Sequence, residues 1–256
     1  MIWDVPPKIW MPPKPAIIRP AEKKLLAPAL AASFLPGMFP GGAISGGEPP
    51  VITLTDGVDA PSAFTTTHTF SSQNIGSAAA DRYVIVAAAV ESGAGTPTIT
   101  SVTIGGVSAT FLVNAANANF TRGVLASLLV TTGTTTTIVI NTSTNSVAYM
   151  AVWSKVGGTT PDTPFDTGSD NTITGGSASL TIDYPANGAV LGLAAGHYMT
   201  GGAGSLTGLT STGSAIGIVG SMRVGHDNGV SAETNHAIAK SSYYGSDGVL
   251  LAASWG

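Results

Sequence analysis

Residues 83–90, with the sequence YVIVAAAV, decide the fold class of this chain. The run has no charged residue, and Arg82 and Glu91 bound it. A strand in the middle of a layered structure is covered on both faces, so it reads as a continuous apolar run instead of an alternating one. The segment therefore predicts a central β-strand.

The flanking segments also have the texture of strands. In residues 64–70, Phe and His positions alternate with threonines, and Ile104-Gly105-Gly106-Val107 has the sequence of a tight hairpin turn. No long window has a helical period after residue 50. The candidate strands are 51–55, 63–70, 82–90, 98–104, 107–113, 122–130, 135–141, 147–154, 178–182, 188–195, 215–224, 234–241 and 248–255.

Many short strands at this spacing predict an all-β fold, an antiparallel β-sandwich of jelly-roll-like type over residues 51–256. Small residues such as Ala87–Ala89 allow close packing of sheets, and Trp153 and Trp255 are expected to fill the wider parts of the core. Strand 248–255 is apolar along its length and is expected to pair centrally.

Two pairs of segments look alike. Residues 83–90 resemble 189–195, and residues 149–154 resemble 250–254. Because no fixed period connects them, we interpret the likeness as the shared composition of core strands and predict no solenoid.

Residues 1–50 form a different region, which holds eleven of the sixteen prolines. Prolines forbid a continuous helix and remove donors from a strand ladder, so this arm is expected to be extended. A short helix over 21–34 and a Gly/Pro hinge over 36–50 are expected within it. The apolar run 25–35 has the length of a signal-peptide core, but a Trp- and Pro-rich leader precedes it, so we expect no secretion signal.

Large apolar side chains lie between the prolines of the arm. A flexible linker lacks such groups, whereas a stiff chain that carries them is suited to docking in a groove of a partner. The expected partner-binding residues are Trp3, Ile9, Trp10, Met11, Ile17 and Ile18. Folding of the arm back onto its own body is the alternative.

Charged residues make up 9% of the chain, against roughly 25% in an average soluble domain. A surface with so few charges suits a protein that is packed against neighbours, and a homo-oligomer is expected. The net charge of −4 argues against nucleic-acid binding. No apolar stretch reaches the length of a membrane helix, and without cysteine there is no disulfide or thiolate site.

Candidate chemical motifs are few. His226, Asp227, Asn228, Glu233 and His236 are ligand-type residues close in sequence, but calcium loops need more carboxylates than this, so no metal or other cofactor is predicted. The acids of segments 55–59 and 162–170 are interpreted as turn residues. No Gly-x-Ser-x-Gly elbow or phosphate loop is present, so no catalytic residue is assigned and the chain is predicted not to be an enzyme.

Exposed aromatic residues on a sandwich can form a platform for glycans. The candidates for such contacts are Tyr198, Tyr243 and Tyr244, of which the last two lie beside Gly245 and Asp247. The alternative is that these tyrosines pack at the edges of hairpins.

Three segments carry a resemblance to a known class of protein. Residues 82–86 (RYVIV), 100–110 (TSVTIGGVSAT) and 147–158 (VAYMAVWSKVGG) resemble β-sandwich modules of phage tail-fibre and virion accessory proteins, and the segment Ile9 to Pro15 is similar to their virion-anchoring leaders. The resemblance covers roughly residues 80–160 and implies a structural role without catalytic residues.

These observations together predict a phage virion structural protein, assembled in the host cytoplasm and located on the particle. Residues 1–50 are expected to bind capsid, neck or tail proteins, with the sandwich displayed as a decoration or fibre. The alternative is a glycan-binding module of a secreted or surface protein, and a host glycan is a candidate partner in either case.

Overall fold

The fold was analysed in a computed structural model, which describes residues 47–59, 63–93, 95–116, 121–159, 162–171, 177–197, 205–216, 220–241 and 248–256. Within these ranges every regular element is a β-strand, and all strand pairs are antiparallel. The described segments include no helix with the length and apolarity to span a bilayer. The predicted all-β class is therefore confirmed, whereas the arm and its expected helix lie outside the described residues.

The described residues of the body form sixteen strands. The first eight are β1 (Val51–Asp59), β2 (Thr65–Asn74), β3 (Tyr83–Glu91), β4 (Ile99–Ile104), β5 (Val107–Ser108), β6 (Thr110–Ala116), β7 (Thr121–Leu129) and β8 (Thr135–Val156). The other eight are β9 (Asp166–Asp170), β10 (Ser177–Tyr184), β11 (Gly188–His197), β12 (Ser205–Thr207), β13 (Ser211–Ile216), β14 (Gly220–Val230), β15 (Glu233–Ser241) and β16 (Gly248–Trp255).

The first eight strands form one jelly roll. Strand β8 belongs to both of its sheets: residues 135–142 pair with β2 and β4, and residues 147–156 pair with β1 and β3. One sheet thus runs β5-β4-β8-β2 and the other β1-β8-β3-β7-β6. The first strand pairs with the end of the last one and the second strand with its beginning, which is the nested connectivity of a jelly roll.

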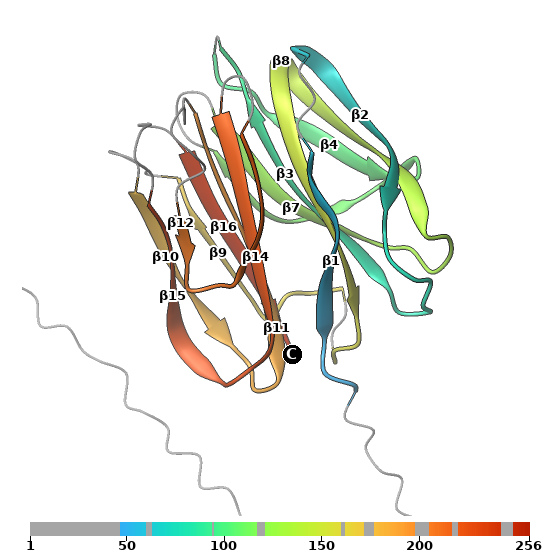
Figure 1. The fold of residues 1–256 in the computed structure, drawn as a ribbon, viewed down its shortest axis with the longest axis vertical. Coiled ribbons are helices and arrows are strands. Elements are labelled where there is room, and N and C mark those ends of the chain that lie inside the picture. The colour runs from blue at the N-terminus through green and yellow to red at the C-terminus, as the bar shows by residue number, and fades with distance from the viewer. Residues whose placement is uncertain are drawn as a thin grey trace, which may run out of the picture. The chain divides into compact units, whose positions relative to one another are not determined.

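The second half of the chain repeats this connectivity. Its sheets run β10-β15-β12 and β13-β14-β11-β16-β9. Strand β9 pairs with the last strand β16, β10 pairs with the penultimate β15, and β11 lies between β14 and β16 as β3 lies between β7 and β8. The body is therefore two jelly rolls of the same topology in tandem (Figure 1).

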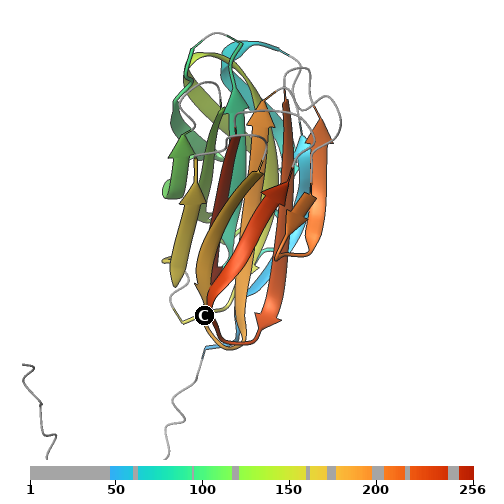
Figure 2. The same ribbon diagram turned by 90° about the vertical axis from the view of Figure 1, so that its left-hand side faces the viewer.

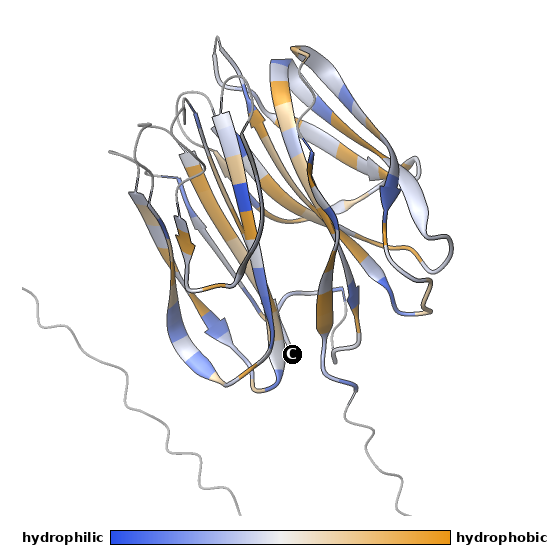
Figure 3. Ribbon diagram, viewed as in Figure 1, coloured by the Kyte–Doolittle hydropathy of each residue, from blue (hydrophilic) through white to orange (hydrophobic). Residues whose placement is uncertain are grey.

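The two jelly rolls stack through their five-stranded sheets, which gives four layers with three apolar cores between them. Strand β3 shows the principle, because Ile85, Ala87 and Ala89 enter the central core while its even-numbered residues enter the core of the first jelly roll. Hydrophobic residues concentrate on the inner strands (Figure 3), and Figure 2 looks onto the outer side of the second jelly roll. The central-strand prediction for residues 83–90 is confirmed.

The stacking is reciprocal. Strand β1 packs beside β13, and β9, which is the counterpart of β1, packs beside β6, the counterpart of β13. In a two-fold symmetric dimer, surface i contacts surface j and j contacts i in the same way. The single chain thus reproduces the contact pattern of a two-fold dimer of jelly rolls.

Several predicted details are confirmed. Strand β16 pairs on both sides, with β11 and β9, and Trp153 and Trp255 are buried in the central core. The Gly105-Gly106 turn joins β4 and β5, and both glycines have the positive φ that such a turn requires (61° and 81°).

Other predictions were wrong in boundary or number. Segments 135–141 and 147–154 are one strand, β8, which continues through a bend at residues 143–145 from one sheet into the other. The range 215–224 spans the end of β13 and the start of β14, and strands β9 and β12 were missed because polar and small residues dominate them. A single sandwich was expected where two occur, and the similar segments attributed to core composition are equivalent strands, β3 with β11 and β8 with β16.

Of the acids that were assigned to turns, Asp162 lies in a turn as predicted, and the other four lie in strands. Asp56 and Asp59 belong to β1, at register shifts in its pairing with β8, and Asp166 and Asp170 are the two ends of β9. They still bond to nearby main chain, as expected of aspartate: Asp56 accepts from the amide of Gly57, and Asp166 accepts from that of Thr167.

Candidate functional site

The seam between the two jelly rolls holds the largest buried side chains of the body. Its centre is apolar and close-packed, with alanines from β3, β8, β11 and β16 that bring the sheets together. Trp153 and Trp255 fill this core from β8 and β16, and Tyr149 lies beside them in the same cluster. A seam of this kind resembles a protein core and not a transient contact, so the two jelly rolls form one body.

A side-chain clamp closes one edge of the seam. The amide of Ile52 donates to Asn228 Oδ1 over 2.7 Å, and Asn228 Nδ2 donates to the Ile52 carbonyl over 2.8 Å. Strand β1 is an edge strand, so these main-chain groups would otherwise have no ladder partner. The Asn228 carboxamide from β14 takes the place of a neighbouring strand's peptide group, and it joins the second jelly roll to the first.

A second cross-seam contact involves the indole of Trp153. Its Nε1–H lies 3.4 Å from His226 Nδ1 on β14, and a buried indole N–H needs an acceptor. The contact requires that Nδ1 carry no proton. Burial lowers the pKa of His226, with Asp227 partly opposing this, which favours the neutral ring.

Ionisable side chains meet at the end of the seam where β3 and β11 finish. Glu91 from β3 points across the seam, and its Oε2 lies 3.6 Å from Nδ1 of His197 on β11. Lys240 on β15 is near Glu91, and its ammonium donates to the carbonyl of Ala195 over 3.0 Å. The three side chains are at most 3% exposed. Gly220 provides the space, since a Cβ there would overlap the Glu91 carboxyl group.

Burial controls the protonation of this cluster. It raises the pKa of Glu91 well above its usual range, and Lys240 offsets only part of that effect. Burial also lowers the pKa of Lys240 to about 8, with Glu91 opposing. Such groups can exchange a proton, but solutes do not reach side chains this deeply buried. The cluster is suited to fixing the alignment of the two jelly rolls, a role that buried polar groups serve in other proteins.

A buried lysine marks the opposite end of the seam. Lys155 Nζ donates to the carbonyl of Gly157 and lies over the rings of Tyr83 and Trp255, at 5.5 and 5.9 Å from their centroids. Burial lowers its pKa to about 8, against the fields of Asp81 and Asp162. Lys155 thus holds the connection that leads from the first jelly roll into the second.

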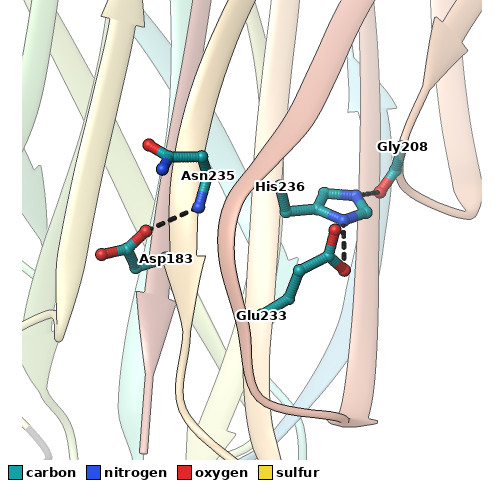
Figure 4. A network of polar contacts seen from close by, with 5 residues as sticks. All are labelled: Asp183, Gly208, Glu233, Asn235 and His236. Carbon is teal, nitrogen blue, oxygen red and sulfur yellow. Dashed lines mark hydrogen bonds and ion pairs between the residues drawn. The ribbon is translucent and has the colours of Figure 1, made fainter.

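The five ligand-type residues named from the sequence are divided among four separate contacts. His226 lies in the seam, Asp227 accepts from the amide of Thr210, and Asn228 forms the clamp. Glu233 and His236 form a separate contact (Figure 4), in which His236 lies 2.8 Å from Glu233 Oε2 and 2.8 Å from the Gly208 carbonyl. No group of three or more metal-ligating side chains occurs within the part of the chain that the structure describes.

The His236 contact organises the turn after β12. The ring of Tyr184 stacks on His236 with 4.5 Å between centroids, and Asn235, which has a positive φ of 56°, donates its amide to Asp183 over 2.8 Å (Figure 4). These bonds connect strands β10 and β15 to the turn at Gly208. The arrangement therefore serves local structure in the second jelly roll.

The binding residues predicted from the sequence lie outside the described residues. This holds for the arm residues Trp3, Ile9, Trp10, Met11, Ile17 and Ile18, and for Tyr198, Tyr243 and Tyr244. Both sets stay predictions.

Sequence reasoning placed Trp153 and Trp255 in the core but missed the polar residues of the seam. Glu91 and Lys240 each follow an apolar or small run, YVIVAAAV and AIA, and a lone charge in that position is a usable signal of burial. Nothing in the sequence pairs them, because they come from different jelly rolls. The clamp residue Asn228 was considered from the sequence as a ligand-type residue, whereas it lies in β14 and joins the two jelly rolls.

Comparison with known proteins adds no relative: no protein-family model matches the chain, and neither the curated proteins nor the solved structures contain a significant match.

Proposed function

We propose that this chain is a structural, non-catalytic component of a bacteriophage virion. In this proposal residues 1–50 attach the chain to a capsid, neck or tail protein, and the tandem jelly rolls are displayed outward as a decoration or fibre. The observation that carries the proposal is the construction of the body from two jelly rolls locked by a continuous core. Jelly rolls recur in viral capsid and lectin domains, and the step from fold to function is made by that analogy.

The use of polar residues supports a structural role. The clustered ionisable groups of the described body, Glu91 with His197 and Lys240, Lys155, and Glu233 with His236, each bond to neighbouring strands or connections. Arg82 is also fully buried, and its guanidinium donates to the carbonyls of Gly76, Val130 and Thr132. These groups hold loops and sheets in place, which is what a mechanical part of a particle needs.

The outer faces of the body suit a protein that packs against neighbouring molecules. On the outer sheet of the first jelly roll, Thr67, Asn141 and Ser101 lie side by side across three strands. On the outer sheet of the second, Ser177, Ser241 and Ser205 do the same. Rows of short uncharged side chains make flat surfaces that pack without the cost of desolvating charge.

The proposal is tested on particles from a strain that carries the gene. A variant without residues 1–24 is expressed in place of the full chain, and purified particles are analysed by quantitative mass spectrometry. We expect the truncated body to be soluble and folded by circular dichroism but at least tenfold depleted from particles. Normal incorporation of the truncated chain would contradict the anchoring role, and absence of the full chain from particles would contradict the virion assignment.

A further inference from the structure

The described surface contains a pocket on the first jelly roll. It has a volume of about 620 Å³ and lies at the end of the first jelly roll where β2 starts, β3 ends and β8 bends. Pockets of about 300–1,000 Å³ are typical for small-molecule ligands. The lining residues are Phe64, Thr66, Ser92, Gly93, Ser143, Thr144 and Asn145.

Phe64 supplies an accessible aromatic ring to this pocket. Its side chain is 45% exposed, although the alternating pattern of residues 64–70 places it in register with the buried His68 and Phe70. The ring lies near Gly93, where an added Cβ would be 4.0 Å from Phe64 Cε1. Because Gly93 has no side chain, the ring is left uncovered toward the pocket.

The polar wall of the pocket is held in place by a buried network. The bend of β8 carries Ser143, Thr144 and Asn145, and Thr142 Oγ1 lies 2.8 Å from the Thr144 carbonyl. The hydroxyl of Ser146 lies 3.2 Å from Thr142 Oγ1 and 3.2 Å from Nε2 of the buried His68.

Main-chain bonds fix the same bend from the other side. The amide of Ser143 donates to the Thr98 carbonyl, and the amide of Thr98 donates to Ser143 Oγ, both over 2.9 Å. A wall held at this many points keeps its shape without a ligand, which lowers the ordering cost of binding.

From this geometry we propose that the pocket binds a neutral saccharide. An aromatic face next to hydroxyl and carboxamide groups matches a sugar ring, which has an apolar C–H face and a rim of hydroxyls. Among the described residues, the lining has no cationic side chain to pair with a carboxylated or sulfated sugar and no anionic one to select an amine. The described lining residues all belong to the first jelly roll, and the saccharide proposal does not depend on attachment of the chain to a particle.

The test uses the full-length chain and defined probes. Lactose, maltotriose, mannotriose and chitotriose serve as neutral saccharides and 3′-sialyllactose as the anionic one, with binding measured by saturation-transfer NMR and calorimetry. We expect at least one neutral probe to bind, and 3′-sialyllactose to bind no better than lactose. Failure of all four neutral probes to bind would overturn the proposal, as would a preference for 3′-sialyllactose over lactose.

Variants locate the binding. Phe64→Ala removes the ring, and Gly93→Leu covers it while leaving Phe64 in place, so a folding defect in one variant does not block the test. Each is expected to weaken binding about tenfold, a loss in the range of aromatic contacts. The control is Phe165→Ala, because Phe165 is 58% exposed and does not line this pocket. Unchanged binding in both pocket variants would overturn the proposal, as would loss in Tyr243→Ala and Tyr244→Ala alone.

Discussion

Replacement of Asn228 by alanine removes the clamp on the edge of the seam, and its effect can be estimated from the structure. The two hydrogen bonds to Ile52 measure 2.7 and 2.8 Å, and Ile52 itself is 1% exposed. An amide and a carbonyl of β1 therefore lose their protein partner, although water can replace part of the carboxamide because Asn228 is exposed. Each of the two hydrogen bonds contributes about 0.5–1.5 kcal/mol net, so we expect Asn228→Ala to lower the free energy of unfolding by about 2 kcal/mol.

The corresponding assay is urea unfolding followed by tryptophan fluorescence, supported by a thermal melt. A loss of about 2 kcal/mol corresponds to about 4–8 °C in Tm for a domain of this size. Asn228→Asp keeps the acceptor for the Ile52 amide but places a carboxylate oxygen against the Ile52 carbonyl, so it should be at least as destabilising. The control is Asn145→Ala, an exposed position on β8.

In Asn228→Ala, a change in the unfolding free energy of less than about 0.5 kcal/mol, the range of ordinary surface substitutions, would contradict a stabilising role of the Asn228 clamp. The same role would be contradicted if Asn145→Ala were as destabilising as Asn228→Ala.

Four further predictions concern stability. The folded pKa of His226 lies below its unfolded value of 6.5, so the stability it contributes is present above pH 6.5 and is lost as the pH falls toward the folded pKa. His226→Gln should therefore reduce the dependence of the unfolding free energy on pH in this acid range, as measured by urea unfolding. An unchanged pH dependence would count against the Trp153 contact. Lys155 and Lys240 have folded pKa values of about 8, against an ordinary value of 10.5, so the free energy of unfolding should rise between about pH 8 and 10.5. Lys240→Met should reduce that rise. A wild-type unfolding free energy that does not change over this pH range would refute the burial of both ammonium groups. Arg82→Met leaves three carbonyls without their donor and should cost about 3 kcal/mol or more by chemical denaturation, and a cost below about 1 kcal/mol would argue against its role as a pin. Deletion of residues 248–256 removes a strand that is paired on both sides and buried throughout, so the product should be insoluble or unfolded by circular dichroism, and a soluble product with one cooperative transition would refute the central placement of β16.

The strand class and the core of the fold were predictable from the sequence because they depend on local patterns. The continuous run 83–90 and the apolar strand 248–255 indicated central strands, and the Gly105-Gly106 pair indicated a hairpin. Each of these signals is complete within ten residues. Trp153 and Trp255 could be assigned to the core because large apolar side chains at the ends of apolar runs are usually buried.

The duplication was not predictable, because topology is preserved where sequence is not. Strands β3 and β11 occupy equivalent positions but share a composition more than a sequence, and β9 is a short polar strand where its counterpart β1 is longer. Long-range pairs were also beyond the sequence. Asn228 meets Ile52 across 176 residues, and no local pattern specifies that contact.

The pocket illustrates the same division. Phe64 continues the alternation that buries His68 and Phe70, but it lies just before β2 and is 45% exposed. The hydroxyls and the carboxamide around it come from the bend of β8, which was predicted as a gap between two strands. An arrangement that depends on a bend between two sheets becomes visible only when the sheets are placed.

Cryo-electron microscopy of purified particles tests the central functional claim most directly. We predict density for two stacked jelly rolls on the outside of the particle, joined to another virion protein by a segment that contains Trp3 and Trp10. Particles that lack this density while the chain accumulates elsewhere in the cell would contradict this claim, and so would a particle-bound body whose first 50 residues contact only their own subunit.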